Sequence, residues 1–166
     1  MEKLESILAE YPFFREMKLG HLRAIVEGAS NVRFDPEAYI FHEGEELDKF
    51  YFITRGRVAL ELHGAQRGAI QIQTIDEGEL LGWSWLTPPY KTRFSARATE
   101  LTRAIAFDGS RIRAKCERDH ELGYELLRQV TQTIGQRLDA TRLQLLDLYG
   151  LHGAQRGGGK SHVSGE

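Results

Sequence analysis

The residues best suited to bind an anion form one short segment in the middle of the chain. It reads Glu77-Gly78-Glu79-Leu80-Leu81-Gly82-Trp83-Ser84-Trp85-Leu86, and Arg93 and Ser95-Ala96-Arg97-Ala98 follow it. This order predicts a strand, a glycine turn, one helical turn and a return strand. Because the first amides of a helix have no partner within the helix, such a turn can point several N–H groups at one anion. The segment therefore predicts a site for an anionic ligand such as a phosphate.

The elements that must position this segment follow from the spacing of hydrophobic residues. Two short N-terminal helices are expected, one containing Leu4, Ile7 and Leu8 and one containing Leu19, Leu22, Ile25 and Val26. Short β-rich runs follow at residues 38–42, 49–54, 57–62, 69–75, 93–98 and 101–107, with a hairpin tip at 64–68. Many short strands at near-regular spacing indicate an antiparallel sandwich or barrel. Four glycines are expected at its corners with positive φ: Gly44, Gly56, Gly78 and Gly82.

Strand character ends at Asp108-Gly109-Ser110, and two helices are expected after it. Asp108 or Ser110 can cap a helix near residues 110–117, and a long helix is expected from 119 to 148. Gly150 is expected to end that helix, because glycine often follows the last helical residue. The prediction is thus one domain over residues 1–149 and a flexible glycine- and serine-rich tail over 150–166.

The long helix carries one largely apolar stripe. Its members are Leu127, Ile134, Leu138, Thr141, Leu145 and Leu148. A helix of this length exceeds what one small sandwich can cover, so part of the stripe is expected to meet a second copy of the chain in a homodimer. Packing on the chain's own sheet is the alternative.

Composition limits the classes of function. The 166 residues suit one domain, and hydrophobic and charged shares of 41% and 28% are ordinary for a globular protein. No signal peptide or membrane span is visible, so the cytoplasm is the expected location and no membrane partner is expected. Cys116 is the single cysteine and the net charge is −2, so a disulfide, a thiolate zinc site and nucleic acid as the main partner are not expected.

The order of elements resembles the cyclic nucleotide-binding domain family, and several residues agree with it. Ile40, Gly44, Asp48, Tyr51, Ile53, Gly56 and Val58 match its pattern of glycine corners and core residues, and residues 77–82 match the approach to its phosphate-binding cassette. The resemblance covers about residues 12–148. It implies a mainly β fold with flanking helices: an antiparallel, jelly-roll-like β-roll with N-terminal helices, an embedded cassette helix and a long C-terminal helix.

The cassette departs from the family at two positions. After the glycine, here Gly82, the family places a glutamate that accepts a hydrogen bond from the ribose 2′-hydroxyl, whereas this chain has Trp83, whose indole can only donate. The family's phosphate-binding arginine would fall at Thr92, and Arg93 comes one residue later. Because successive strand residues face opposite sides, the offset matters unless a loop absorbs it. Arg93 is the candidate phosphate ligand, with Lys91 and Arg97 in reserve. A solvated charge at the strand edge is the alternative.

The other candidate contacts each have a structural alternative. Ser84 can offer its amide and hydroxyl to an anion or simply cap the helical turn, and Ser95 lies on the return strand beside Arg93. Trp83 and Trp85 could stack on a purine, but burial of at least one is favoured. The segment around Arg137 and Thr141 resembles the helix by which the catabolite activator family contacts the base. There Thr141 would touch the base and Arg137 would be a polar neighbour. A place in the helical stripe is the alternative for Thr141.

Three classes of function remain in competition. The leading hypothesis is a non-catalytic sensor that binds a cyclic nucleotide or a related phosphate ester and signals through its C-terminal helix to a second subunit or another protein. The second is a degenerate domain that keeps the fold, binds no nucleotide and serves as a dimerisation or protein-interaction module. An enzyme is not expected, since the six histidines form no metal-binding pair and no nucleophile motif is present, so no metal or cofactor other than the ligand is predicted.

Two further features of the sequence stand apart from these hypotheses. The catabolite activator family continues into a helix-turn-helix domain, and this chain ends where that domain would begin. The segment Leu62–Gly68 recurs identically as Leu151–Gly157, which has no physical explanation in the sequence.

Overall fold

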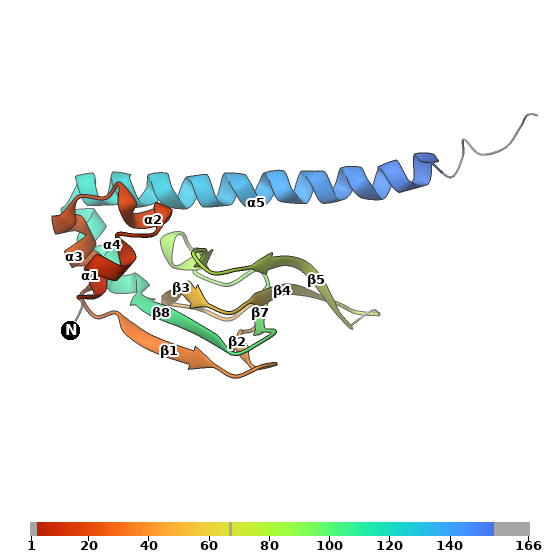
Figure 1. The fold of residues 1–166 in the computed structure, drawn as a ribbon, viewed down its shortest axis with the longest axis horizontal. Helices are drawn as coiled ribbons and strands as arrows, with labels where there is room; N and C mark the ends of the chain where they lie inside the picture. The colour runs from red at the N-terminus through yellow and green to blue at the C-terminus, as the bar shows by residue number, and fades with distance from the viewer. Residues whose placement is uncertain (1–2, 67, 155–166) are drawn as a thin grey trace, which may run out of the picture. The chain divides into compact units, whose positions relative to one another are not determined.

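Three short helices open the chain (Figure 1). The computed structural model describes residues 3–66 and 68–154, with side chains through residue 150. The helices are α1 (Leu4–Leu8), α2 (Pro12–Arg15) and α3 (Leu19–Val26). The hydrophobic spacing predicts only the first and third of these, and α2 is the additional helix. Proline is tolerated in the first helical turn, where its missing N–H has no partner to lose, and it begins α2.

Eight strands form two four-stranded sheets in which every pairing is antiparallel. They are β1 (Ser30–Phe34), β2 (Tyr39–Phe41), β3 (Lys49–Arg55), β4 (Val58–Gly64), β5 (Gly68–Ile75), β6 (Leu80–Leu81), β7 (Ser95–Ala98) and β8 (Thr102–Asp108). One sheet has the order β1-β8-β3-β6 and the other β2-β7-β4-β5. The predicted β-roll is confirmed, as is the hairpin tip, since Gly64 pairs with Gly68.

Strand β1 was missed by the sequence analysis, because it is mostly exposed and carries no clear apolar alternation. The strand expected before the glycine turn is present as the two-residue β6. The four predicted corner glycines do take positive φ, at +86° for Gly44, +99° for Gly56, +83° for Gly78 and +91° for Gly82.

Strand β3 shows how the sequence builds two hydrophobic layers. Phe50 and Phe52 belong to a cluster shared with α1 to α4 and the first turns of α5, whereas Tyr51 and Ile53 belong to a cluster shared with the second sheet. Because side chains of a strand alternate between its faces, one strand supplies both layers. Strand β3 is therefore buried on both faces.

Two helices follow the last strand: α4 (Gly109–Arg118) and α5 (His120–Ala154). The predicted cap of the first is confirmed, since Asp108 Oδ1 accepts a hydrogen bond from the Arg111 amide at 3.1 Å. The predicted helix end at Gly150 is wrong, because α5 continues through it to Ala154. A single glycine within a helix costs only about 1 kcal/mol, so it need not end one. Within the described ranges 3–66 and 68–154, no helix combines the length and hydropathy that crossing a membrane requires.

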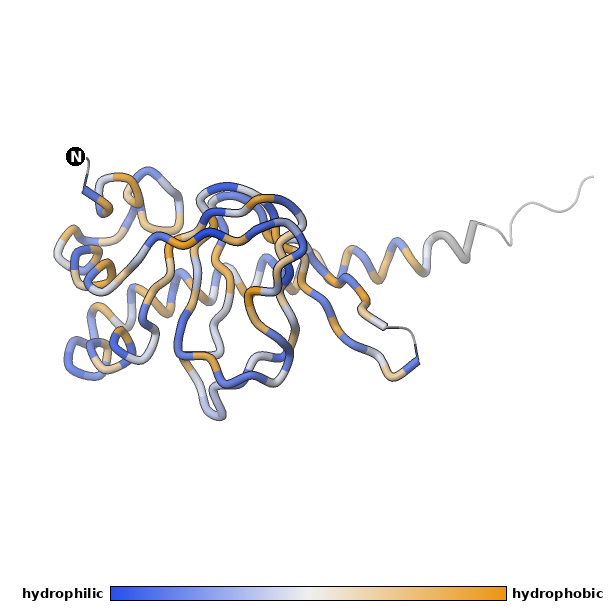
Figure 2. Tube along the Cα trace, turned by 90° about the horizontal axis from the view of Figure 1, so that it is seen from below, coloured by the Kyte–Doolittle hydropathy of each residue, from blue (hydrophilic) through white to orange (hydrophobic). Residues whose placement is uncertain are grey.

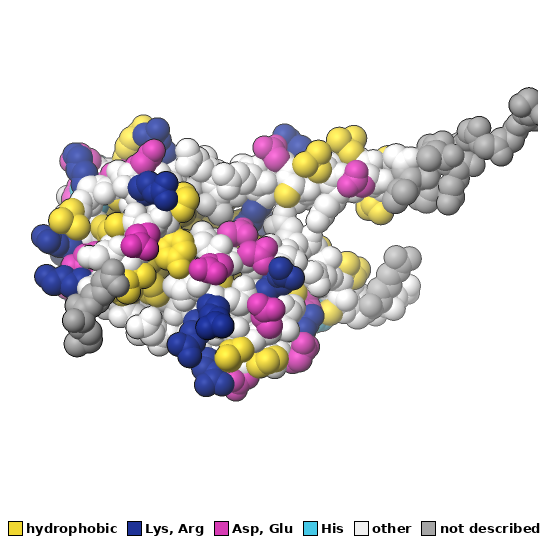
Figure 3. Space-filling view, in the orientation of Figure 1, with side chains coloured by type: hydrophobic (Ala, Val, Ile, Leu, Met, Phe, Trp, Pro, Cys, Tyr) yellow, Lys and Arg dark blue, Asp and Glu magenta, His cyan; other side chains and the backbone are white. Residues whose placement is uncertain are grey.

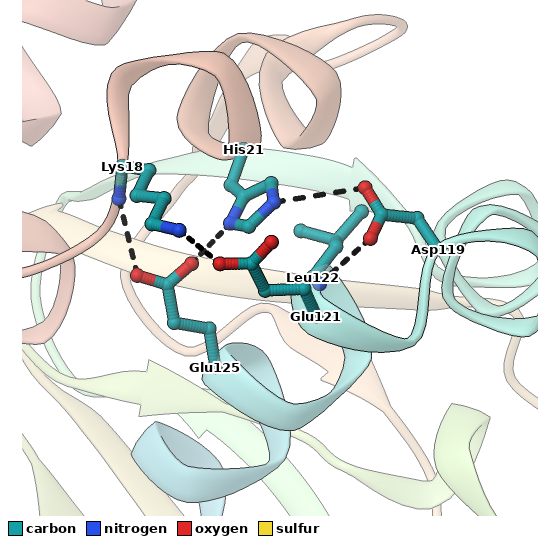
Figure 4. A network of polar contacts seen from close by, with 6 residues as sticks. All are labelled: Lys18, His21, Asp119, Glu121, Leu122 and Glu125. Carbon is teal, nitrogen blue, oxygen red and sulfur yellow. Dashed lines mark hydrogen bonds and ion pairs between the residues drawn. The ribbon is translucent and has the colours of Figure 1, made fainter.

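The first turn of α5 is tied to the N-terminal helices by ion pairs (Figure 4). His21 lies between two carboxylates, with Nδ1 against Glu125 and Nε2 3.6 Å from Asp119 Oδ2. Glu125 Oε1 also accepts a hydrogen bond from the Lys18 amide at 3.1 Å, and Lys18 Nζ pairs with Glu121. These contacts fix where α5 starts.

The chain divides into two compact units, Met1–Thr131 and Gln132–Glu166, each described here by itself. The helix α5 runs unbroken across the boundary. The predicted tail begins inside that helix at residue 150, and its residues 155–166 lie outside the described range. The repeated segment adopts two structures, since Leu62–Gly64 ends a strand and Leu151–Ala154 ends α5.

Candidate functional site

The candidate site begins where β6 ends. Leu80 and Leu81 are fully buried in opposite layers, so this two-residue strand is anchored on both faces. Gly82 follows with φ of +91°, a conformation that a residue with a Cβ rarely adopts, and turns the chain into the single 3₁₀ turn η1 (Ser84–Leu86). The predicted strand, glycine turn and helical turn are thereby confirmed, with a 3₁₀ geometry.

Trp85 fixes this turn from the core side. Its ring is completely buried and stacks on Phe50 with centroids 4.7 Å apart. Its carbonyl accepts a hydrogen bond from Arg113 Nη1 at 2.5 Å, and a Cβ added to Gly109 would lie 2.7 Å from its Cβ. The turn is thus held by the core and by α4, independently of any ligand.

A pocket of about 90 Å³ lies on the other side of the turn. Its walls come from Gly82, Trp83 and Ser84 on one side and from the loop Thr87–Phe94 on the other, with Phe41 of β2 as a further wall. Two of the lining residues, Trp83 and Phe94, meet edge to face with 6.1 Å between their ring centroids. Because pockets for whole small ligands usually measure about 300–1,000 Å³, the space in this conformation suits a group such as a phosphate.

The polar groups of the pocket favour an anion. Lys91 and Arg93 line it, both are exposed, and neither makes an ion pair with any residue in the described part of the chain. The Ser84 hydroxyl is buried and has no hydrogen-bond partner among the described residues. A buried hydroxyl without a partner is costly, and an anionic oxygen would satisfy it. Two cations thus line a cavity whose wall also includes Ser84 and contains no carboxylate.

Comparison with known proteins identifies the family of the fold. The family described as the cyclic nucleotide-binding domain matches residues 31–119, more than half of the chain. The chain belongs to this family. Domains of this family are regulatory and bind ligands. The segment from Glu77 to Ala98 corresponds to the family's phosphate-binding cassette.

Three similar proteins show how widely the domain is used. The crystal structure of a candidate cyclic nucleotide-binding protein from Geobacter metallireducens has 26% identity and a TM-score of 0.74, covering 82% of this chain and 99% of that one. The sensor domain of the transcriptional regulator DNR from Pseudomonas aeruginosa has 18% identity and a TM-score of 0.66, covering 81% and 91%. A candidate potassium channel protein of Rhodopseudomonas palustris is 25% identical over 87% of this chain, which spans 34% of that protein.

The cyclic nucleotide-binding domain brings four of the predicted contacts together. Gly82, Trp83, Ser84 and Arg93 all line the pocket, as does the reserve residue Lys91. The offset of the arginine is absorbed by the loop before β7: Thr92 turns inward, its hydroxyl donating to the His42 carbonyl at 2.7 Å, while Arg93 remains exposed.

Two predicted contacts lie elsewhere. Trp85 belongs to the core, as the packing alternative anticipated, and is absent from the residues that line the pocket. Ser95 is also buried, and its Oγ accepts a hydrogen bond from the Glu43 amide at 2.9 Å. Both residues stabilise the walls from behind.

Arg97 is not available as a reserve phosphate ligand. Its Nε donates to Glu61 Oε1 at 2.5 Å and its Nη1 to Glu37 Oε2 at 2.6 Å. The hydrogen bond to the buried Glu61 raises the pKa of Arg97 further above its ordinary value. The choice of Arg97 as a reserve is therefore wrong, because its Nε and Nη1 already donate to carboxylates.

The two predicted contacts of the final helix lie in the second unit. Arg137 and Thr141 are one helical turn apart in α5, and the Thr141 hydroxyl donates to the Arg137 carbonyl at 2.9 Å. This back-bond is what a threonine within a helix commonly makes. Contact with a nucleotide base stays a prediction for both residues.

Sequence reasoning missed the apolar walls of the pocket. Phe41, Phe94 and the pair Pro88-Pro89 line it, although nothing in their spacing distinguishes them from ordinary core or loop residues. The one usable signal was the unusual sequence Thr87-Pro88-Pro89-Tyr90-Lys91 immediately after the helical turn.

Proposed function

We propose that this domain senses a cyclic nucleotide or a related phosphate ester, whose phosphate enters the pocket beside η1. The observation that carries the proposal is one cavity lined by Arg93, Lys91 and Ser84. Within the described residues neither cation forms an ion pair, and the buried Ser84 hydroxyl has no hydrogen-bond partner. Charge-assisted hydrogen bonds to an anion are about twice as strong as neutral ones, so this set favours a phosphate over a neutral ligand.

The roles of the residues follow from their chemistry. Arg93 supplies two N–H groups in a planar fork that matches two phosphate oxygens, and Lys91 supplies a flexible point charge. The Ser84 hydroxyl donates to a third oxygen. Because the cavity measures only about 90 Å³, the ribose and base lie at its mouth beside Trp83 or enter after the loop Thr87–Phe94 moves.

Signalling runs through α5 in this proposal. The helix begins in the unit that holds the pocket and continues as the second unit. In the second unit many of its large apolar residues are exposed, and Figure 2 shows hydrophobic residues recurring along it between hydrophilic ones: Ile134, Leu138, Leu143, Leu145, Leu146, Leu148 and Tyr149. A second copy of the chain is the proposed partner of these residues, since an exposed apolar stripe on a long helix favours helix–helix association. Ligand occupancy would then shift the population of α5 positions in the dimer.

A titration tests the proposal directly. Purified chain is titrated separately with cyclic AMP, cyclic GMP, a cyclic dinucleotide and inorganic phosphate, with tryptophan fluorescence and thermal unfolding as readouts. A saturable fluorescence change and a rise in Tm with one of the cyclic nucleotides are expected, because a ligand that binds only the folded state stabilises it. No response to any of them would overturn the proposal.

A second candidate is a degenerate domain that binds no nucleotide and acts through its surfaces. The observation in its favour is Trp83, which stands where the family has a ribose-binding carboxylate and narrows the pocket against Phe94. This candidate predicts a dimer whose stability does not respond to nucleotide. Sedimentation of the chain with and without cyclic AMP separates the two candidates.

A further inference from the structure

An opposed pair of arginines, the arginine row, spans strands β1 and β8. Arg33 of β1 is directly opposite Arg103 of β8. Arg55 of β3 is aligned with Arg103 only across a register shift that follows Ile53. Directly opposed side chains share one face of a sheet, with Cβ atoms about 4.5–5.5 Å apart. Like charges at this spacing repel, so the arginine row costs stability unless something balances its charge.

Of the arginine row, the described residues pair only Arg33 with a carboxylate. Arg33 pairs with Asp35 at 3.2 Å, but both side chains are largely exposed, and such pairs contribute little. Within residues 3–66 and 68–154, the guanidinium groups of Arg103 and Arg55 form no ion pair. Figure 3 shows basic side chains gathered on the face that carries β1 and β8. The chain as a whole carries a net charge of −2, so this cluster is a local exception.

A groove of about 460 Å³ lies directly beside the arginine row. Leu4 and Ile7 of α1 and the nearly buried Ile105 of β8 belong to its apolar lining, and Arg33 and Arg103 belong to its polar lining. The volume falls within the range of about 300–1,000 Å³ that is usual for small-ligand sites. None of its residues lines the pocket beside η1.

The combination selects one class of ligand. An apolar wall from α1 suits a hydrocarbon body, and an arginine fork suits a carboxylate. We propose that this groove binds a small amphipathic carboxylate, such as a medium-chain fatty acid, with its carboxylate on Arg103 and its apolar body against Leu4 and Ile7. The site is separate from the cyclic nucleotide pocket, and its occupancy neutralises the repulsion within the arginine row.

Calorimetric titration of the full chain with decanoate tests the proposal, with decanol and acetate as matched probes. Decanoate is expected to bind saturably, with one molecule per chain, and to raise the Tm. Decanol lacks the charge and acetate lacks the apolar body, so each is expected to bind at least tenfold more weakly.

Variants separate the site from general surface effects. Arg103→Gln is expected to weaken decanoate binding at least tenfold while the Tm of the ligand-free chain stays the same or rises, because a like-charge contact is removed. Ile7→Ser is expected to weaken decanoate binding and leave acetate unaffected. Arg118→Gln, which changes an exposed arginine at the end of α4, and Arg93→Gln are expected to bind decanoate as the parent chain does.

Several outcomes would overturn the proposal. Decanoate binding that is not saturable would show that there is no specific site. Binding that Arg103→Gln leaves intact would show that the arginine row does not hold the carboxylate. Equal binding of decanol shows an apolar surface without anion recognition. A short acidic peptide is titrated in the same way. If the peptide binds saturably and decanoate does not, the partner is a protein and the small carboxylate is rejected.

Discussion

Arg97 of β7 and the buried Glu61 of β4 form a hydrogen-bonded ion pair, with Nε 2.5 Å from Oε1. The pair joins neighbouring strands of the second sheet, and Arg93, four residues before Arg97, is left as the exposed arginine at the pocket. One arginine therefore stabilises the fold and the other is free to meet a ligand.

Removing Arg97 is expected to destabilise the domain without affecting ligand affinity. Arg97→Gln leaves the Glu61 carboxylate buried without its main partner, which should cost about 1–3 kcal/mol in the free energy of unfolding. Urea unfolding measures this loss. The matched control is Arg57→Gln, which breaks the exposed pair with Asp76 and should cost less than about 1 kcal/mol. Equal losses in the two variants would contradict the assignment.

Removing Arg93 is expected to lower ligand affinity and leave the stability of the domain unchanged. Arg93→Gln deletes an exposed cation that lines the pocket, so the Tm should hardly change. Affinity for the cyclic nucleotide should fall about 10- to 100-fold, since a hydrogen bond between charged groups contributes about 1.5–3 kcal/mol. Fluorescence titration measures the loss, and Arg118→Gln serves as the control. An unchanged affinity would assign the phosphate to Lys91 or to another site.

Restoring a carboxylate at position 83 should restore ribose recognition. Trp83→Glu provides the hydrogen-bond acceptor that the indole lacks, and it widens the pocket. Affinity for cyclic AMP should rise about tenfold or more, and the gain should be absent with the 2′-deoxy analogue. Trp83→Leu is the control that widens the pocket without an acceptor. A gain of equal size in both variants would show that space, and not the hydroxyl contact, was limiting.

Gly109 should be intolerant of any side chain, because it packs against the back of the candidate site. A Cβ there would lie 2.5 Å from the Asp48 carbonyl and 2.7 Å from the Trp85 Cβ. Gly109→Ala should cost about 1–3 kcal/mol through overpacking and should shift the emission of the stacked Trp85. The control Gly20→Ala meets nothing within 4 Å in helix α3, and it should stabilise the chain by about 0.5–1 kcal/mol.

Asp108 should make stability depend on pH at the acidic end. The hydrogen bond from the Arg111 amide lowers the pKa of its carboxyl below the usual 3.8. Because the folded pKa is lowered, the contribution is complete above pH of about 4 and is lost as the pH falls through the folded pKa. Asp108→Ala should therefore cost about 1 kcal/mol at pH 7 and progressively less below pH 4. Asp108→Asn keeps the cap, so it should lose little at pH 7. Thermal unfolding from pH 7 to 2.5 measures both; a constant difference would contradict the prediction.

Much of the fold could be predicted from the sequence because its signals are local. Alternation along β3 places Phe50 and Phe52 in one layer and Tyr51 and Ile53 in the other, and it requires no knowledge of the partner strands. The corner glycines likewise report the backbone conformation of single residues, and the four that were predicted all have positive φ.

Local signals failed at two positions in the helices. Gly150 resembles a helix end, but α5 continues through it, since one glycine within a helix costs only about 1 kcal/mol. Pro12 begins a helix because proline loses no hydrogen bond in the first turn, and Phe13 and Phe14 of that helix are buried.

By itself, the sequence determined the class of fold, the glycine turn before Ser84 and the set of residues from which an anion site could be built. Only the tertiary structure decided which members of that set face the cavity. In the sequence Trp83 cannot be told from Trp85, nor Arg93 from Arg97, as a ligand contact. In the structure Trp85 is buried against Phe50 and Arg97 is paired with Glu61, and both partners are distant in the chain. Burial and pairing depend on contacts between distant segments, and a single sequence does not encode those contacts in any local pattern.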